Sequence, residues 1–400
     1  MKNNLVKRKK VLVLGHDNRS FLCVIRSLGR AQIEVHVAWH RNVEAIYSKY
    51  VHKIHDIPPF KVGEKDWLDA MVNVLKEEMF DLVIPCHDSS IIPLQKYQYD
   101  LQKYAEIYTI NDKAYSVLFN KINTNQLARE LGINLPRELI VTNLEEIDKI
   151  LANFDFPIVI KPVNSCTEQN LFSKHFVKKA YTEKDLHNYL QESLKAGPVI
   201  IQENFIGYGV GIDLLLKDGQ PLMTFQHIRV HEPLHGGGSS YRKSSVVHPE
   251  LLEASLKIMK ELNYSGVAMV EFLYNPKTND WIFVEVNARF WGSLPLAVAA
   301  GANFPLALFN MMVDGELKFP QTYRKEIYCR NIKRDLSWQV ENLRADHLDP
   351  TLATRPILKI IKETLFNLFS LRERYDEITM DDPKPGIIEV KNMIREMWLR

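Results

Sequence analysis

The side chains with the clearest chemical potential lie in one short stretch, Gly266–Phe290. Glu271 falls within its first apolar run, and Glu285, Asn287 and Arg289 fall within or just after its second. Because side chains alternate along a strand, the last three should share one face. Carboxylate and amide oxygens resist burial in apolar strands unless a hard divalent cation binds them. The pattern therefore indicates a cation site with Arg289 placed to contact a phosphate, or else an ordinary polar face on a solvated sheet.

A β-hairpin is needed to bring these residues together. Val267–Tyr274 and Trp281–Val286 are rich in β-branched and aromatic residues, and Asn275–Asp280 supplies the turn chemistry. Glu271 and Glu285 face each other only if this turn sets the register suitably. A slip of one residue would place them on opposite faces, and the sequence leaves both registers open.

Composition narrows the class of protein. The 400 residues, 46% of them hydrophobic, predict about two or three domains with substantial cores. Lys and Arg number 51 against 49 Asp and Glu, so the net charge of +2 gives no reason to expect nucleic acid or an acidic membrane as partner. The four cysteines lack CxxC spacing, and no apolar run reaches the roughly 18 residues of a membrane span. We expect a soluble, cytoplasmic protein without a transmembrane segment.

Residues 1–112 are predicted to form a parallel α/β domain, because short apolar runs alternate with helical spacing. The expected strands are Val11–Gly15, Glu34–Trp39 and Leu82–Pro85, and the expected helices are Arg19–Gly29 and Trp67–Met79. Clefts in such sheets lie beyond the strand ends, here at Gly15–Ser20 and Cys86–Ser90. The first loop lacks GxGxxG, so no dinucleotide site is predicted. The polar residues of the two loops are either substrate contacts or loop caps: Asp17, Arg19, His87 and Asp88.

Residues 113–320 are predicted to form a larger α+β domain, because antiparallel strand patterns alternate with helices. The expected helices are Ala114–Gly132, Glu145–Asn153, Glu183–Lys195 and Pro249–Leu262. Besides the hairpin, the expected strands are Glu138–Val141, Phe156–Pro162, Phe172–Lys178, Pro198–Glu203, Ile212–Leu216 and Leu222–Val230.

Several residues of this domain could belong to a functional site, and each also has an ordinary structural interpretation. Lys121 on the first helix and Lys161 at a strand end are either site residues or solvated surface lysines. The glycine loop His235–Ser240 suggests a phosphate cradle but does not match a P-loop. Cys166 and His175 lack a third orienting group, so a catalytic nucleophile pair is not favoured.

The tail, residues 321–400, is expected to be mostly helical. Pro356–Leu371 and Ile387–Trp398 show helical apolar spacing. Its apolar positions either pack on the rest of the chain, form a homodimer contact or meet a membrane surface; they include Ile360, Leu365, Leu368 and Phe369. Packing is favoured, because the mixed charge is unlike that of a basic membrane helix.

The order of these features resembles the ATP-grasp superfamily over roughly residues 11–320. A lysine on a helix and a lysine at a strand end are followed by an apolar link after a carboxylate, a glycine-rich loop, Glu, and then Glu-x-Asn-x-Arg. Carboxylate–amine ligase-like proteins are especially similar in the runs QHIRVHE (Gln226–Glu232), GGGSSYRKS, GVAMVEF and EVNARFWGSLPLAVAAG (Glu285–Gly301). The resemblance implies a pre-ATP-grasp, Rossmann-like domain (1–112), an ATP-grasp domain with an outer lobe (about 113–200) and an inner lobe (about 201–320), and a helical C-terminal extension (321–400).

The resemblance also implies roles for individual residues. The residues that it assigns to ATP are Lys121, Lys161, Gln202, Glu203, Phe205 and Ile206, with Asp213 as the nearest carboxylate for the ribose. The Mg²⁺ (or Mn²⁺) ligands that it implies are Glu271, Glu285 and Asn287. The catalytic residues are Arg289 and Lys161, which would neutralise developing charge, with Arg229 and Arg242 as candidates for gripping the carboxylate substrate.

The reaction implied by the resemblance is ATP-dependent ligation of a small-molecule carboxylate to an amine. The carboxylate would attack the γ-phosphate to give an acyl phosphate and ADP, and the amine would then displace phosphate. Two alternatives stay open, an ATP-grasp phosphotransferase without amine capture and a catalytically inactive nucleotide-binding module. The second arises because Val163–Asn170 lacks the glycines that the family usually has there.

Overall fold

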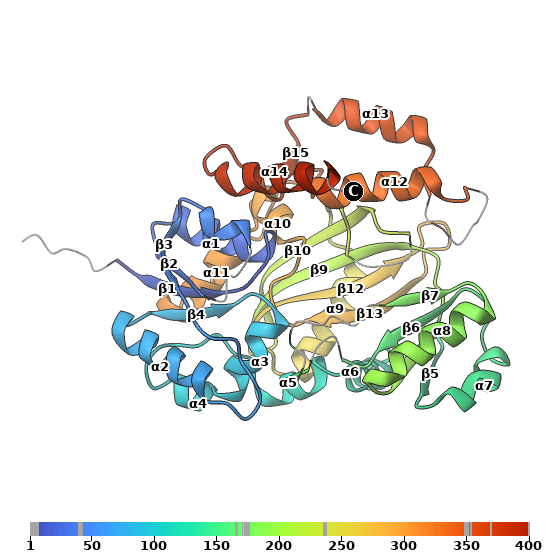
Figure 1. The fold of residues 1–400 in the computed structure, drawn as a ribbon, viewed down its shortest axis with the longest axis horizontal. Helices are drawn as coiled ribbons and strands as arrows, with labels where there is room; N and C mark the ends of the chain where they lie inside the picture. The colour runs from blue at the N-terminus through green and yellow to red at the C-terminus, as the bar shows by residue number, and fades with distance from the viewer. Residues whose placement is uncertain are drawn as a thin grey trace, which may run out of the picture. The chain divides into compact units, whose positions relative to one another are not determined.

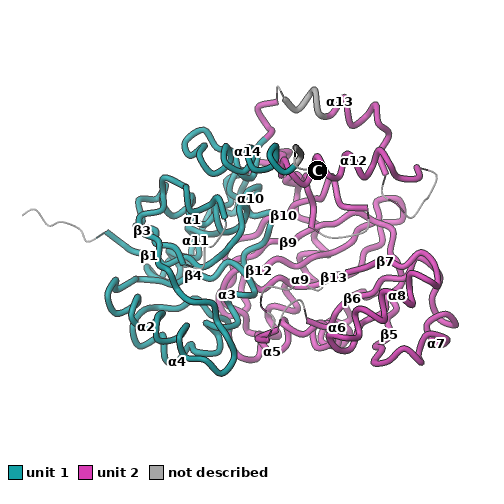
Figure 2. The backbone as a smooth tube through the Cα atoms, viewed as in Figure 1, with its two compact units in different colours: residues 1–110, 289–323, 374–400 teal, residues 111–288, 324–373 magenta. Residues whose placement is uncertain are grey.

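A computed structural model of the chain describes residues 8–38, 43–164, 167–169, 171, 177–234, 238–347, 352, 354–368 and 370–398. The chain divides into two compact units, which Figure 2 shows in different colours. Unit 1 comprises residues 1–110, 289–323 and 374–400, and unit 2 comprises residues 111–288 and 324–373. The expected segments 113–320 and 321–400 are therefore each divided between the units. The first expected boundary, at 112, lies beside the change of unit after residue 110.

Unit 1 is built on a parallel sheet with the strand order β3-β2-β1-β4. The strands are β1 (Lys10–Leu14), β2 (Glu34–Ala38), β3 (Val51–His55) and β4 (Leu82–Pro85). The chain moves outward from β1 to β3 and then returns past β1 to β4. Because such crossovers are right-handed, this reversal puts α1 (Ser20–Arg30) and α2 (Asp66–Glu78) on opposite faces of the sheet (Figure 1). The carboxyl ends of β1 and β4 then lie side by side.

The remaining helices of unit 1 come from distant parts of the chain. They are α3 (Asp88–Lys96), α4 (Gln98–Leu101), α10 (Leu294–Ala300), α11 (Phe304–Phe309) and α14 (Lys384–Trp398), with a 3₁₀ turn η1 (Glu44–Tyr47) and a π-helical turn η4 (Asn310–Asp314). Helices α10 and α11 pack against α1, which explains why residues 289–323 belong to unit 1. The sequence pattern did not indicate α3, which contains Pro93.

A buried ion pair fixes the C-terminal segment to unit 1. Arg26 Nε on α1 lies 2.9 Å from Asp382 Oδ2, and both side chains are almost wholly buried. The other Asp382 contacts are a hydrogen bond from the Ser48 hydroxyl (2.7 Å) and one from the Lys49 backbone N–H (2.9 Å). The Arg26 guanidinium also donates to the backbone carbonyl of Glu377 at 2.8 Å. Both charges therefore have close partners, as buried charges require.

Unit 2 contains a sheet with the order β5-β8-β6-β7, whose pairings are antiparallel. Its strands are β5 (Glu138–Val141), β6 (Ile158–Pro162), β7 (Lys178–Ala180) and β8 (Val199–Glu203). Helices α7 (Ile147–Leu151) and α8 (Glu183–Ser193) close the apolar core on one face, with 3₁₀ turns η2 (Leu144–Glu146) and η3 (Leu194–Ala196) at their ends. Alternation along β6 and β8 leaves the other face for Lys161 and Gln202.

A second sheet of unit 2 has the order β13-β12-β9-β10-β11-β14-β15. Its strands are β9 (Tyr208–Lys217), β10 (Gln220–His231), β11 (Tyr241–Ser245), β12 (Gly266–Tyr274), β13 (Trp281–Asn287), β14 (Tyr328–Arg330) and β15 (Glu373–Tyr375). The helices of unit 2 outside the first sheet are α5 (Asp112–Leu118), α6 (Lys121–Glu130), α9 (Pro249–Glu261), α12 (Ile332–Arg344) and α13 (Ile357–Leu368). Helix α9 packs on β9 and β10, and α6 contacts β13.

A buried polar network ties α12 to the second sheet. His231 Nδ1 on β10 lies 2.8 Å from Asp335 Oδ1, and its ring stacks on Trp338 with 3.7 Å between centroids. Arg330 on β14 contacts Asp335 and also Glu373, whose Oε1 lies 3.0 Å from Arg330 Nε. Although burial opposes ionisation, the hydrogen bond from His231 and the Arg330 charge lower the pKa of Asp335 to about 2. This part of the expected tail therefore packs on the chain; the side chains of Leu365, Leu368 and Phe369 lie outside the described set.

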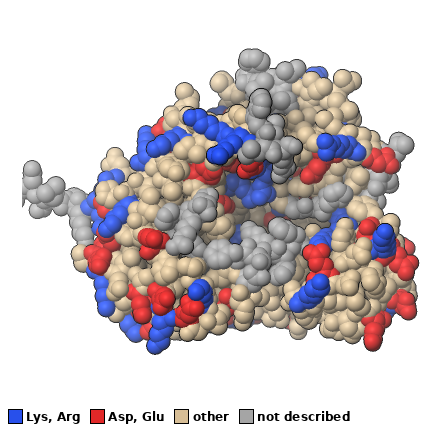
Figure 3. Space-filling view, viewed as in Figure 1, with Lys and Arg blue, Asp and Glu red and all other residues tan. Residues whose placement is uncertain are grey.

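The described surface carries both charge signs. Basic and acidic side chains are interspersed over the face shown in Figure 3, in keeping with the net charge of +2. Among the described residues, no single helix combines the length and apolar composition of a membrane span; α10 and residues 304–314 meet those criteria only when joined across a bend of 91°.

We expect Asp382→Asn to destabilise the protein by about 3 kcal/mol, because it leaves the buried Arg26 guanidinium without its counter-charge. The adjacent Asp381 is the matched control. Its ion pair with Arg30 is 37% and 40% exposed on the two sides, so Asp381→Asn should change the free energy of unfolding by less than about 1 kcal/mol. Urea unfolding followed by circular dichroism measures both values, and equal effects would contradict the distinction.

Candidate functional site on unit 2

The two glutamates of the hairpin lie directly opposite each other. Glu271 on β12 is the register partner of Glu285 on β13, and Met269 is the partner of Asn287. Because paired residues of neighbouring strands share a face, Glu271, Glu285 and Asn287 point to the same side of the sheet. The Asn287 side-chain amide donates to Glu271 Oε1 at 3.3 Å and to Glu285 Oε1 at 3.2 Å. The register that the sequence left open is thus the one that brings these three side chains together.

This carboxylate pair is held between two cations. Arg229 Nη2 lies 2.6 Å from Glu271 Oε2, and Lys121 Nζ lies 3.8 Å from Glu285 Oε2. Burial raises the pKa of Glu271 even though the Arg229 guanidinium opposes the rise. Positive charge therefore lies beside each carboxylate of the pair.

Lys121 is the first residue of helix α6, and the start of this helix places its side chain beside the carboxylate pair. The single helix expected at Ala114–Gly132 is wrong: the structure has α5 and α6, separated at Phe119 and Asn120. The Asn120 side chain caps α6 by accepting from two backbone N–H groups, those of Ile122 and Asn123. The Lys121 backbone N–H donates to the Val163 carbonyl at 3.0 Å, which ties the start of α6 to the end of β6.

Arg229 reaches Glu271 because β9 carries glycines where the side chain crosses it. A Cβ at Gly209 would lie 2.4 Å from Arg229 Cδ, and a Cβ at Gly211 would lie 2.1 Å from His227 Cε1. Such separations are far below van der Waals contact, so any side chain at either position would displace Arg229 or His227. Gly209 and Gly211 form a Gly-x-Gly pattern within a strand. Because glycine in a strand often marks a place where another group comes close to the backbone, this pattern was a sequence signal for the crossing side chains.

Two further residues on this face are fully enclosed. Asp213 has no exposed surface and lies 3.2 Å from His227 Nδ1, so its carboxylate faces that ring rather than an accessible surface. Burial lowers the pKa of His227 to about 3, which keeps the imidazole neutral. Arg242 on β11 is also fully buried and is the register partner of Arg229. Two guanidinium groups therefore start from paired positions on neighbouring strands, and Arg229 is the one that contacts the carboxylate pair.

The first sheet of unit 2 contributes Lys161 and Gln202 from one face. Burial lowers the pKa of Lys161 to about 8, although the Glu285 charge opposes this change. Gln202 donates to Glu138 Oε2 at 2.9 Å, and the Asn125 amide donates to the same oxygen at 2.7 Å. The sequence analysis did not single out Glu138. The feature that could have indicated Glu138 is its position at the start of a strand, where it is the register partner of Gln202.

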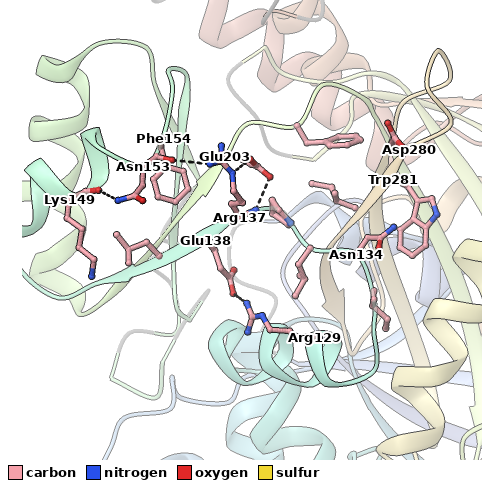
Figure 4. Close-up of a pocket in the computed structure, with 16 residues that line it drawn as sticks. Arg129, Asn134, Arg137, Glu138, Lys149, Asn153, Phe154, Glu203, Asp280 and Trp281 are labelled. Carbon is pink, nitrogen blue, oxygen red and sulfur yellow. Dashed lines mark hydrogen bonds and ion pairs between the residues drawn. The ribbon is translucent and has the colours of Figure 1, made fainter.

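Glu203 points to the opposite side of that sheet. Its carboxylate lies 2.7 Å from Arg137 Nε, beside Phe154, as Figure 4 shows. It faces a cavity of about 890 Å³, which Phe205 also lines and which Asp280 and Trp281 border on the other side. Because neighbouring residues of a strand alternate, Gln202 and Glu203 cannot present their side chains to one ligand. Ile206, the next predicted residue, is 58% exposed.

Arg289 belongs to unit 1 and lies beyond the end of β13. Its guanidinium makes a bidentate contact with Asp88, at 2.6 Å from Nε to Oδ1 and 3.1 Å from Nη2 to Oδ2. The strand face predicted for three residues therefore holds only Glu285 and Asn287. Within unit 1, Asp17 accepts from the Phe21 backbone N–H at 2.9 Å and from the Ser20 hydroxyl at 3.1 Å, which is a loop-cap role.

Several predicted features fall outside the described residues. They are Cys166, His175, most of the strand predicted at Phe172–Lys178, and the part of the glycine loop formed by residues 235–237. The loop Val163–Asn170 is described only in part.

Comparisons of the sequence with known proteins find an ATP-grasp family and enzymes that are similar to parts of the chain. A family described as "ATP-grasp in the biosynthetic pathway with Ter operon" matches residues 195–334. The carbamoyl phosphate synthase large chain of Pyrococcus furiosus is 25% identical over 215 residues, which is 50% of this chain and 19% of that protein. The D-aspartate ligase of Enterococcus faecium is 24% identical over 264 residues, covering 61% of this chain and 62% of that protein. The chain therefore spans less than two thirds of the length of either relative.

The fold is similar to that of solved enzymes. The ADP complex of N5-carboxyaminoimidazole synthetase from Staphylococcus aureus superposes with a TM-score of 0.65 at 14% sequence identity. The match covers 90% of this chain and 97% of that one. At this identity the likeness shows a common fold.

We expect Gly211→Ala to destabilise the protein by about 1–3 kcal/mol, because the added Cβ would overlap the His227 ring. Gly238→Ala is the matched control, since among the described residues the atom nearest to its Cβ would be 3.8 Å away. Thermal unfolding compares the two variants with the parent protein. A neutral effect at Gly211 would show that the His227 side chain does not need this space.

Proposed function

Since the chain belongs to the ATP-grasp superfamily, we propose that it is an ATP-dependent ligase that joins a carboxylate to an amine and releases ADP and phosphate. The observation that carries the proposal is the carboxylate pair Glu271 and Glu285, bridged by Asn287 and faced by Lys121. Such a site can hold a cation and a polyphosphate together. The similarity to a D-aspartate ligase supports an amide-forming reaction.

The donor set fits Mg²⁺ or Mn²⁺, because both ions prefer oxygen ligands. Glu271 and Glu285 would supply carboxylate oxygens, and Asn287 would supply its amide oxygen in place of the amide N–H groups that now bridge the pair. The bound ion would neutralise charge on the phosphates of ATP during transfer. Lys121 and Arg229, which now balance the two glutamates, would then be available to bind other anions.

The nucleotide would lie against the polar face of the first sheet of unit 2. Lys121 and Lys161 would hold its phosphates, and Gln202 would contact the adenine edge from the same face as Lys161. Glu203 would contribute through its backbone, since its side chain is paired with Arg137. The predicted apolar contacts of the base, Phe205 and Ile206, and the predicted ribose contact, Asp213, belong to this proposal as well.

Catalysis would consist of positioning and charge neutralisation, without a protein nucleophile. A substrate carboxylate oxygen would attack the γ-phosphorus and expel ADP, giving an acyl phosphate. An amine would then attack the acyl carbon, expel phosphate and lose a proton to give the amide. Arg289 and Lys161 would stabilise the transferred phosphate. Arg229 and Arg242, at paired positions of adjacent strands, would hold the substrate carboxylate.

We expect ATP affinity to fall as the pH rises through about 8, because burial lowers the pKa of Lys161 to about 8 in the free protein. Below that pH the ammonium is charged and available to phosphate. Above it, each further pH unit should raise the Kd by up to about tenfold, because binding must then take up a proton. Fluorescence titration with ATP measures the dependence. Lys161→Arg should abolish it, since guanidinium stays protonated; an unchanged slope in that variant would contradict the role of Lys161.

An assay with pooled carboxylic acids and amines tests the reaction itself. We expect ADP and phosphate to appear together with a condensed amide, in a strict dependence on both substrates. Release of AMP and pyrophosphate would overturn the acyl-phosphate route. ADP formation with a phosphorylated acid and no amide would instead identify a phosphotransferase, and no turnover with retained ATP binding would identify an inactive module.

We expect Glu285→Gln to abolish Mg²⁺-dependent turnover while the fold stays intact, because the pair loses one anionic ligand. Glu326→Gln is a matched control in the same unit, since Glu326 pairs with Lys243 at 2.9 Å and lies outside the carboxylate pair. Circular dichroism and thermal unfolding establish folding in both variants. Normal activity in Glu285→Gln would refute the assignment of the metal site.

A further inference from the structure

A cluster of metal-type ligands lies in unit 1, apart from the residues of the proposed ligase site. His36 on β2, His55 on β3 and Glu78 at the end of α2 present one ligand atom each, and these atoms all lie within 4.8 Å of one another. His36 Nδ1 is 2.9 Å from His55 Nε2 and 3.8 Å from Glu78 Oε2. Three protein ligands at such mutual distances are the number and type found in open tetrahedral zinc sites.

The second nitrogen of His36 is held by a carboxylate. His36 Nε2 lies 3.0 Å from Glu34 Oε1, so Nε2 carries the proton and donates it to the glutamate. This tautomer leaves the lone pair of His36 on Nδ1, the atom that faces His55 and Glu78. A carboxylate that orients a histidine in this way is the usual outer partner of a metal-bound imidazole.

The surroundings keep both imidazoles neutral and enclosed. His36 and His55 are buried, and the ring of Phe80 packs edge-on against both, with 5.1 Å and 6.0 Å between centroids. Burial lowers the pKa of His36, and it lowers the pKa of His55 to about 4. Neutral imidazole is the form that binds a metal.

Two lysines now supply the positive charge beside the cluster. Lys10 Nζ lies 3.0 Å from Glu78 Oε2 and 3.5 Å from Glu34 Oε1, and Lys53 contacts the other oxygen of Glu78. Lys53 is 53% exposed on a flexible side chain, so its ammonium can leave for solvent. A metal ion and the lysines would therefore compete for the same carboxylate.

We propose that His36, His55 and Glu78 form a binding site for a borderline divalent transition metal such as Zn²⁺, with Glu34 as the outer partner of His36. Imidazole ligands favour such ions over Mg²⁺, which distinguishes this site from the one proposed at Glu285. A bound ion would join α2 to β2 and β3 and so stabilise unit 1. The inference does not depend on the proposed ligase activity.

The test is metal binding by the full chain after chelator treatment and desalting. Isothermal titration with Zn²⁺ should give one ion per chain, and Co²⁺ should give the visible absorption of a tetrahedral site. Glu78→Gln and His55→Gln should each weaken Zn²⁺ binding by at least about tenfold. His187→Gln is the matched control, since His187 is exposed, lies on α8 in unit 2 and belongs to neither histidine–carboxylate group of the described residues; it should leave the affinity unchanged.

A substitution that should strengthen Zn²⁺ binding provides a second test. Lys53→Met removes a competing cation from Glu78, so it should tighten Zn²⁺ binding and increase the rise in melting temperature that Zn²⁺ causes. A network that merely balances charge predicts no Zn²⁺ uptake by any of these proteins, and that result would overturn the proposal. Binding that persists unchanged in both Glu78→Gln and His55→Gln would also overturn it, because the ion would then occupy other ligands. Circular dichroism of each apo variant establishes that the fold is retained.

Discussion

Two carboxylates placed opposite each other, on the buried strand β12 and the half-buried strand β13, require positive charge beside them, and much of unit 2 follows from that constraint. Glu271 and Glu285 are met by Arg229 from β10 and by Lys121 from α6. Arg229 crosses an intervening strand to reach its partner, which is possible only because Gly209 leaves the crossing point empty. Lys121 reaches its partner only because a helix begins there. The helix start at Lys121 and the glycine at 209 thus both bring positive charge to the carboxylate pair.

Alternation along a single strand divides the neighbourhood of this site into two environments. Gln202 shares a face with Lys161, where buried amides and a glutamate form a polar surface. Glu203, the next residue, turns to an aromatic-lined cavity and pairs with Arg137. A ligand on the lysine face and a molecule in the cavity would therefore meet different side chains of the same β8 strand.

Features that depend on periodicity or on a local motif could be predicted from the sequence, whereas features set by long-range packing could not. The hairpin and its turn were predictable, because alternation and turn residues are local signals. Their register was not, since it depends on how β12 also pairs with β9. The helix break at Asn120 was missed because apolar spacing continues through it, while the capping side chain decides the outcome. The role of Glu138 was invisible because its partners lie 13 and 64 residues away.

The path of the chain between the units has a consequence for the order of assembly. The backbone leaves unit 1 after residue 110, returns at 289, leaves again after 323 and returns at 374. Arg26 is therefore synthesised more than 300 residues before Asp382, the carboxylate that neutralises it. Until that segment is synthesised, Arg26 on α1 lacks both its counter-charge and the backbone carbonyl of Glu377 to which it donates. Unit 1 can therefore complete this contact only after residues 374–400, and with them all of unit 2, have been synthesised.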